Sequence, residues 1–195
     1  MELLNNYKFT QTWYLNSEIR KNLLNHIDKT KKYNILEIGS FEGLSACGFS
    51  DNIMNHHDSI LDCVDPFILS GTNEKITTKN VISNTEEIFI NNINLSKNAN
   101  KIKLYKQTSD DFFKTNQKFY DLIYIDGCHE PEFIKNDIDN SFKFIKKNGI
   151  IWMDDYGGNT TNNGKIKIHI DNYLKNYENS YIIIHKNYQL AIKKI

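Results

Sequence analysis

The apolar positions of the chain alternate between two spacings: short continuous runs, and stripes with a period of three to four residues. Five continuous runs, bounded by polar or turn-forming residues, predict buried strands. The run YDLIYID is almost uninterrupted, as in a strand that is covered on both faces of a parallel sheet. The predicted strands cover residues 34–38, 59–64, 101–106, 120–126 and 149–155.

Helical spacing occupies the segments between and around these runs. The first, SEIRKNLLNHIDK, has a capping candidate in Asn16 or Ser17. The helix expected over 132–147 is long and amphipathic and ends at Asn148-Gly149. The last predicted helix is less regular, because its first half alternates like a strand. Helices are predicted over residues 17–29, 44–55, 85–97, 109–114, 132–147 and 165–177, and polar loops over 70–84 and 157–164.

The C-terminal stretch YIIIHKNYQLAIKKI holds two strand-like runs around Lys186-Asn187, which predicts an antiparallel hairpin. Strands that alternate with helices favour a parallel sheet with helices on both faces. We therefore expect an α/β fold: a Rossmann-like, doubly wound, mostly parallel seven-stranded sheet with a C-terminal antiparallel β-hairpin. The 195 residues suit a single domain. Residues 1–30 would form a helical lead-in that can act as a lid, and residues 34–195 a ligand-binding core.

Charge and composition bear on the class of partner. The 24 Lys and Arg residues equal the 24 Asp and Glu residues, so no global basic field favours a nucleic-acid partner. No apolar run approaches about 18 residues and the N-terminus lacks a basic-then-apolar leader, which predicts a soluble, cytoplasmic protein without a membrane partner. Abundant Asn, Lys and Ile indicate an AT-rich viral or bacterial genome. Three cysteines without metal-type spacing predict free thiols.

The stretch LEIGSFEGLSACGFS carries Gly39 and Gly43 between a predicted strand and a predicted helix. Glycines there let the backbone approach a ligand, and the helix start offers free N–H groups. The spacing G-x-x-x-G fits neither the dinucleotide fingerprint nor the P-loop, so packing glycines are the alternative. Asp65 follows at about the 20 residues where an acid binds ribose hydroxyls; a solvated loop aspartate is the alternative. Ser109-Asp110, taken alone, fits a helix cap.

Acidic residues follow the fourth and fifth predicted strands. Asp126 ends one, and Asp154 with Asp155 ends the other. The carboxyl ends of neighbouring parallel strands meet at one edge, so these carboxylates should converge and repel unless a hard cation such as Mg²⁺ lies among them. His129 is close enough in sequence to serve there as a general base. Helix-capping or solvated aspartates and an incidental histidine are the alternative, and no motif supports Cys128 as a nucleophile.

Four motifs together, ILEIGSFEGLSA, CVDPF, YDLIYIDGCH and NGIIWMDDY, resemble those of class I S-adenosylmethionine-dependent O-methyltransferases. The resemblance covers roughly residues 34–156 and is closest to the metal-dependent kind, similar to catechol and macrolide-sugar O-methyltransferases. The predicted hairpin matches the reversed last strand of that fold. The resemblance implies cofactor contacts from Glu37, Gly39, Gly43, Ser45, Asp65, Ser109, Asp110 and Asp126.

In this resemblance the glycine turn and Ser45 hold the methionine part of S-adenosylmethionine. Asp65 holds the ribose hydroxyls, and Ser109 with Asp110 flanks the adenine. The nature of the cofactor therefore comes from the family motifs, whereas the residues alone indicate only a turn suited to a ligand.

The resemblance also implies a metal and a base. Asp126, Asp154 and Asp155 fall on the metal-ligand positions, with Asp155 in place of the asparagine of catechol enzymes. His129 falls where the catechol enzymes have a lysine base and the sugar enzymes a histidine. The implied reaction is methyl transfer to a hydroxyl of a small molecule or sugar. Mg²⁺ or another divalent cation would bind the acceptor, and His129 would take its proton.

Several alternatives stay open at this point. A nicotinamide-dependent oxidoreductase on a similar sheet is disfavoured by the glycine spacing and the hairpin. A non-catalytic cofactor-binding protein has no need of clustered acids. A nucleic-acid methyltransferase is disfavoured by the neutral charge and by MDDY, which has acids where those enzymes have prolines. Trp13 and Tyr14 are candidates to cover a ligand. The oligomeric state is open, a homo-oligomer included.

Overall fold

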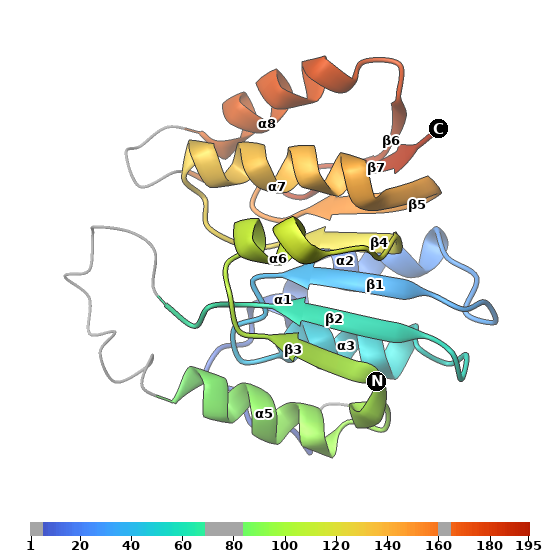
Figure 1. The fold of residues 1–195 in the computed structure, drawn as a ribbon, viewed down its shortest axis with the longest axis vertical. Helices are drawn as coiled ribbons and strands as arrows, with labels where there is room; N and C mark the ends of the chain where they lie inside the picture. Colours follow the sequence, from blue (N-terminus) through green and yellow to red (C-terminus); the bar gives the residue numbers. More distant parts are fainter. Residues whose placement is uncertain (1–5, 69–83, 160–164) are drawn as a thin grey trace.

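Seven strands form one sheet that carries helices on both faces (Figure 1). The computed structural model describes residues 6–68, 84–159 and 165–195. The strands are β1 (Asn34–Ile38), β2 (Ile60–Val64), β3 (Ile102–Tyr105), β4 (Tyr120–Ile125), β5 (Ile145–Met153), β6 (Tyr181–Lys186) and β7 (Leu190–Lys194). Their order is β3-β2-β1-β4-β5-β7-β6. Strands β1 to β5 run parallel and β7 runs antiparallel to its neighbours, which confirms the predicted fold class.

The helices form two layers. The helical elements are α1 (Trp13–Asn16), α2 (Glu18–Asn22), η1 (Leu23–Asn25), α3 (Leu44–Asn52), α5 (Thr85–Leu95), η2 (Ala99–Lys101), α6 (Ser109–Thr115), α7 (Pro131–Phe144), α8 (Ile166–Leu174) and η3 (Lys175–Tyr177). Helices α6, α7 and α8 pack on one face of the sheet, and α2, α3 and α5 pack on the other (Figure 1). In the described part of the chain, no helix is long and apolar enough to cross a bilayer.

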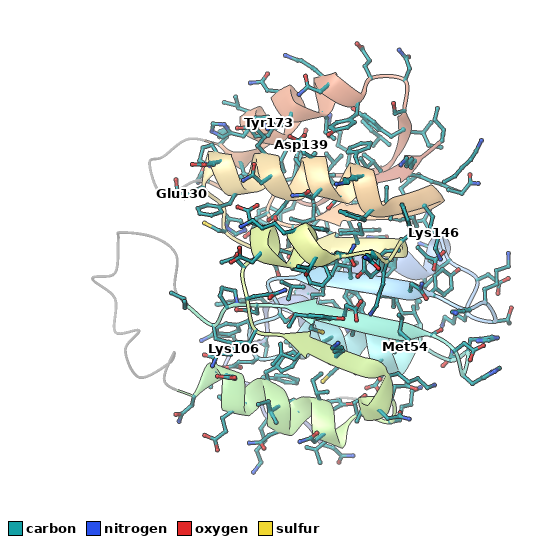
Figure 2. The ribbon with its side chains drawn as sticks, in the orientation of Figure 1. Met54, Lys106, Glu130, Asp139, Lys146 and Tyr173 are labelled. Atoms are coloured by element: carbon teal, nitrogen blue, oxygen red, sulfur yellow. The ribbon has the colours of Figure 1, made fainter. Side chains whose placement is uncertain are left out.

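Alternate side chains of the central strands enter two apolar cores, one on each face. In β1, Leu36 and Ile38 belong to the core under α6, α7 and α8, whereas Ile35 belongs to the core under α2, α3 and α5. Two lysines lie outside these cores, Lys106 at the carboxyl edge of the sheet and Lys146 at the opposite edge (Figure 2). Burial on both faces explains why the central strands read as continuous apolar runs.

The helix predicted over 132–147 is too long. Helix α7 ends at Phe144, and β5 begins at Ile145, so the last predicted turn of helix is strand. Ile145 pairs with Tyr120 of β4, and the register then shifts before the main ladder. Asn148, at φ +63, lies in this irregular stretch. Pairing with β4 thus overrides a local pattern that fits a helix.

The N-terminal helix predicted over 17–29 is also wrong as one element, since it is divided into α2 and η1, with α1 before it. Ser17 does cap α2, because its hydroxyl oxygen accepts from the Arg20 backbone N–H. Asn22 limits the helix, because its side-chain amide donates to the Glu18 carbonyl and competes with the backbone.

The other predicted elements are confirmed with small shifts of their ends. Helix α3 ends at Asn52, three residues before the predicted end at 55, and the helix predicted over 165–177 is formed by α8 and η3. The loop predicted over 70–84 lies outside the described residues except for Asn84, and the loop over 157–164 is described only to residue 159.

Two glycines shape the turn between β1 and α3. Gly39 has φ +83 and Gly43 has φ +82, in the left-handed region that favours glycine. A Cβ on Gly39 would lie 2.0 Å from the backbone oxygen of Asp126, so this turn lies directly against the end of β4. A Cβ on Gly43 would lie 2.9 Å from the Phe89 ring. Gly39 is therefore required by a backbone contact, and Gly43 by a side-chain contact.

We predict that Gly39→Ala destabilises the protein much more than Gly43→Ala. Both variants incur the cost of a left-handed residue, roughly 1–2 kcal/mol. Only Gly39→Ala adds a clash with backbone, because the Phe89 ring opposite Gly43 can shift. Chemical denaturation of the two variants measures the difference. Equal losses of unfolding free energy would show that the contact between the β1 and β4 turns is not tight.

Candidate functional site

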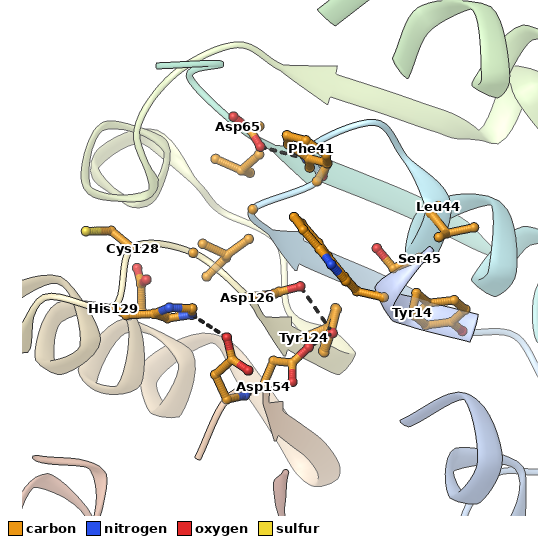
Figure 3. Close-up of a pocket in the computed structure, with 18 of the residues that line it drawn as sticks. Tyr14, Phe41, Leu44, Ser45, Asp65, Tyr124, Asp126, Cys128, His129 and Asp154 are labelled. Carbon is orange, nitrogen blue, oxygen red and sulfur yellow. Dashed lines mark hydrogen bonds and ion pairs between the residues drawn. The ribbon is translucent and has the colours of Figure 1, made fainter. Parts of the chain in front are cut away.

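A cavity of about 1110 Å³ lies at the carboxyl edge of the sheet. Its walls come from the turns after β1 to β5, from the N-terminal segment and from the β6–β7 hairpin (Figure 3). Single small-molecule sites usually occupy roughly 300–1,000 Å³, so this cavity is slightly larger than that range. The predicted site residues that line it are Gly39, Ser45, Asp65, Ser109, Asp126, His129, Asp154 and Asp155.

Glu37 lies behind the cavity wall. Its side chain is fully buried, and the Ser45 hydroxyl, which does line the cavity, donates to Glu37 Oε1. Oε2 has no hydrogen-bond partner among the described residues. Burial raises the pKa of Glu37 to about 7, and the hydrogen bond from Ser45 acts in the opposite direction. Glu37 therefore orients Ser45 at the first turn of α3, and a direct contact with a ligand stays a prediction.

Asp65 fixes the two turns that border the middle of the cavity. Its Oδ2 accepts from the Phe41 N–H at 2.8 Å and its Oδ1 from the Phe67 N–H at 2.6 Å (Figure 3). Both donors have left-handed backbones, at φ +46 and +53. Burial raises the pKa of Asp65, while the backbone hydrogen bonds oppose that rise. The carboxylate thus stabilises a strained backbone and still lines the cavity.

The start of α6 differs from the capping pattern expected of Ser109-Asp110. The N-cap is Thr108, whose hydroxyl oxygen accepts from the Asp111 N–H at 3.2 Å. Ser109 lines the cavity, and its contact with a cofactor stays a prediction. Asp110 is not among the described residues that line it, and its carboxylate accepts from the Asn136 side chain at 3.3 Å. The acid at position 110 is thus directed toward α7.

Three side chains converge where β4 and β5 end. Asp126, His129 and Asp155 each place a potential ligand atom within 4.8 Å of the other two. His129 Nε2 lies 3.4 Å from Asp155 Oδ2. Asp155 has φ +49, and the Tyr188 hydroxyl forms a hydrogen bond with it that, with burial, raises the pKa of Tyr188 to about 12. The predicted meeting of Asp126, Asp155 and His129 is therefore present in the structure.

Asp154 lies beside this group but outside it. Its Oδ2 accepts from the Tyr124 hydroxyl at 2.5 Å, and its Oδ1 from the Gln189 side-chain amide at 2.6 Å. The Tyr124 hydroxyl also lies 3.3 Å from Asp126 Oδ2. Both carboxylate oxygens of Asp154 thus already have donors, and its place as a metal ligand stays a prediction.

The acids at this edge are electrostatically crowded. Burial and then the neighbouring Asp154 and Asp155 raise the pKa of Asp126 well above its ordinary value. Such a shift marks carboxylates that share one site. A divalent cation relieves that repulsion, and carboxylate oxygens are the ligands that Mg²⁺ prefers. The donor set of Asp126, Asp155 and His129 therefore fits a metal ion.

The N-terminal segment covers the opposite side of the cavity. The Thr10 backbone N–H and hydroxyl donate to the carboxylate of Glu42 at 2.6 and 2.5 Å. Trp13 is 70 % exposed and stacks on Phe41, with ring centroids 5.8 Å apart. Trp13 and Tyr14 both line the cavity, which supports the alternative in which this pair covers a ligand.

Tyr124, Asp137 and Gln189 line the cavity, but the sequence did not mark them as site residues. Tyr124 lies within an apolar strand, where a tyrosine is expected to be a core residue. Asp137 had a local signal, because it falls on the buried stripe of the α7 pattern with Ile134 and Ile138. Gln189 had none, since its contacts to residues far away in sequence arise only in the folded chain.

Comparison with known proteins identifies the family. A model for a methyltransferase domain matches residues 36–156. An uncharacterized protein from Acanthamoeba polyphaga mimivirus is 31% identical over 150 residues, covering 76% of this chain. The chain spans 62% of the length of that viral relative. The AT-rich viral or bacterial source expected from the composition stays a prediction.

Solved structures share the fold at low identity. An O-methyltransferase from Bacillus cereus in complex with SAH has a TM-score of 0.63 at 14% identity, covering 92% of this chain and 81% of its own. The O-methyltransferase TomG from Streptomyces achromogenes, involved in tomaymycin synthesis and solved with SAM, has a TM-score of 0.63 at 12% identity, covering 92% and 80%. The motif resemblance, the seven-stranded sheet and the family match agree, and the chain belongs to the family of methyltransferase domains.

Proposed function

We propose that the protein is an S-adenosylmethionine-dependent O-methyltransferase that transfers a methyl group to a hydroxyl of a small molecule or sugar. One observation carries this proposal: a single cavity joins the β1 turn and Asp65 to the group of Asp126, His129 and Asp155. The first part suits a nucleoside cofactor, and the second suits activation of a hydroxyl. The family match supports methyl transfer and argues against a nicotinamide-dependent oxidoreductase.

The cofactor half of the cavity has the groups that S-adenosylmethionine requires. The turn after β1 brings backbone close to the ligand at Gly39, and Ser45 in the first turn of α3 can meet the methionine carboxylate. Asp65 can accept from the ribose hydroxyls while its other lone pairs hold the turn. Ser109 borders the region left for the adenine.

The acidic half fits a divalent cation, and Asp126 and Asp155 would hold it, with Asp154 as the third predicted ligand. When bound, such an ion lowers the pKa of an acceptor hydroxyl and fixes its orientation. The residues of the chain supply the remaining functions. His129 lies at the same edge and takes the hydroxyl proton at a ring nitrogen. The walls of the cavity hold acceptor and cofactor side by side, and such positioning accounts for much of a rate gain.

We predict that the protein binds S-adenosylmethionine and that Asp65→Ala weakens binding about tenfold or more, a loss of about 1.4 kcal/mol or more. The variant loses the ribose acceptor and releases the Phe41 and Phe67 N–H groups. Isothermal titration calorimetry measures the affinity. Asp58→Ala is the control, because Asp58 is an exposed aspartate outside the cavity and should leave the affinity unchanged. An unchanged affinity in Asp65→Ala would remove Asp65 from the cofactor site.

We predict that Mn²⁺, used as a spectroscopic substitute for Mg²⁺, binds the wild type and that Asp126→Asn and Asp155→Asn each abolish binding. Either change removes a charged oxygen ligand from the converging group. Electron paramagnetic resonance of free Mn²⁺ gives the bound fraction. Asp154→Asn tests whether Asp154 is a third metal ligand. Its oxygens already accept hydrogen bonds from Tyr124 and Gln189. Absence of binding to the wild type would overturn the metal assignment.

We predict that His129→Gln keeps cofactor and Mn²⁺ binding but loses methyl transfer by at least about a hundredfold, the usual contribution of a general base. A transfer assay with labelled cofactor against panels of sugars and phenols, with and without Mg²⁺, first identifies an acceptor for the wild type. Transfer at the wild-type rate in His129→Gln would exclude the base role, and loss of Mn²⁺ would make His129 a ligand instead. A wild type that binds cofactor but transfers to no acceptor would favour a non-catalytic binding protein.

A further inference from the structure

Asp137 is a buried carboxyl that faces the cavity without a full set of partners. It lies on α7, its residue is only 2 % exposed, and it belongs to the cavity wall. Its Oδ1 has no hydrogen-bond partner among the described residues. A buried carboxyl oxygen without a partner is costly and rare in folded proteins. A ligand with a matching donor would remove that cost.

The glycine at position 127 lies directly beside the Asp137 carboxyl. A Cβ at Gly127 would lie 3.4 Å from Asp137 Oδ2 and 3.2 Å from the Ile38 side chain. A larger residue at position 127 would place its side chain against the Asp137 carboxyl. Gly127 and Asp137 both line the cavity, and Gly127 places no side chain beside the carboxyl.

Asp137 lies at the end of the cavity where α6 begins, beside Ser109. The Ser109 side chain forms a hydrogen bond with Asp137, and Thr108 and Ser109 line the same cavity. On the proposed function this end takes the adenine. Asp110, the acid predicted to flank the adenine, is directed to Asn136. Asp137 is therefore the acidic side chain that faces this end from the described residues of α6 and α7.

The carboxyl of Asp137 can act as donor and acceptor together. Burial raises its pKa to about 7, the hydrogen bond from Ser109 opposes the rise, and the charge of Asp110 adds to it. A neutral carboxylic acid has one O–H donor and one carbonyl acceptor side by side. Adenine presents the complementary pair, an amino group next to a ring nitrogen, and amide side chains recognise adenine through the same pair.

We propose that Asp137 recognises the adenine of the cofactor by accepting a hydrogen bond from its exocyclic amino group and donating one to the adjacent ring nitrogen. This inference rests on the proposed function, since it assumes that an adenine nucleoside occupies the cavity. It assigns base specificity to a residue of α7, across the cavity from the glycine turn, and it gives the unpartnered Oδ1 a ligand.

The test compares two ligands in three proteins. The ligands are S-adenosylhomocysteine and its purine analogue, in which hydrogen replaces the 6-amino group. We expect the wild type to bind the analogue at least about tenfold more weakly, the scale of one lost hydrogen bond to a buried carboxyl. In Asp137→Ala both ligands should bind with similar, weaker affinity. Asp137→Asn should restore the preference, because an amide offers the same donor and acceptor.

The outcomes separate this inference from the proposed function. If Asp137→Ala weakens both ligands but keeps the wild-type ratio, Asp137 only supports the wall near Gly127 and the recognition of adenine is wrong. If the wild type binds neither ligand, the proposed function itself fails. Circular dichroism and thermal unfolding confirm that Asp137→Ala is folded, which we expect because the substitution removes a buried oxygen that has no partner.

Discussion

The parallel register at the centre of the sheet determines the geometry of the whole site. Backbone hydrogen bonds continue the ladder past the strand ends: the Gly39 N–H donates to the last carbonyl of β2 at 2.9 Å, the Asp126 N–H to that of β1 at 2.9 Å, and the Asp154 N–H to that of β4 at 2.8 Å. These bonds hold the residues after β1, β4 and β5 side by side. A shift of one residue in any pair would point the functional side chains to the other face.

The same register crowds like charges, and the protein stabilises this arrangement with neutral donors. The Tyr124 hydroxyl lies between Asp154 and Asp126, and the Gln189 amide binds the far oxygen of Asp154. These donors leave Asp126 and Asp155 facing His129. The raised pKa of Asp126, caused by burial and the neighbouring acids, shows that repulsion remains. Unfavourable electrostatic energy of this kind is typical of functional sites. There the surrounding fold holds together groups that would otherwise separate.

Much of the fold was predictable because it follows from local patterns. Continuous apolar runs gave the central strands, and the turn residues after them gave Asp65, Asp126 and Asp155 at one edge. The errors occur where a long-range contact overrides a local preference. Pairing with Tyr120 turns residues from Ile145 onward into strand although their pattern fits a helix. The predicted class of architecture is confirmed. The orientation of each carboxylate was not predictable, because it depends on partners that are far away in the sequence.

The two halves of the cavity differ in how they are built. The half around Asp65 consists of strand ends and their turns, whereas the acidic half is also held by contacts between the N-terminal segment and the β6–β7 hairpin. Glu18 Oε2 accepts from the Gln189 N–H at 2.8 Å and lies 2.8 Å from His185 Nε2. Although burial acts to raise it, these hydrogen bonds hold the pKa of Glu18 below its ordinary value.

Gln189 extends this connection to the acids, because its side-chain oxygen accepts from the Ile19 N–H at 2.6 Å while its amide donates to Asp154. Hydrogen bonds therefore connect the N-terminal segment and the hairpin to the acidic edge. Sequence changes at Glu18 or Gln189 would disturb the donors that hold Asp154, whereas the hydrogen bonds of Asp65 with the Phe41 and Phe67 N–H groups do not involve these two residues. A fold built in this way can change the surroundings of its acidic edge through peripheral segments while its central sheet stays the same.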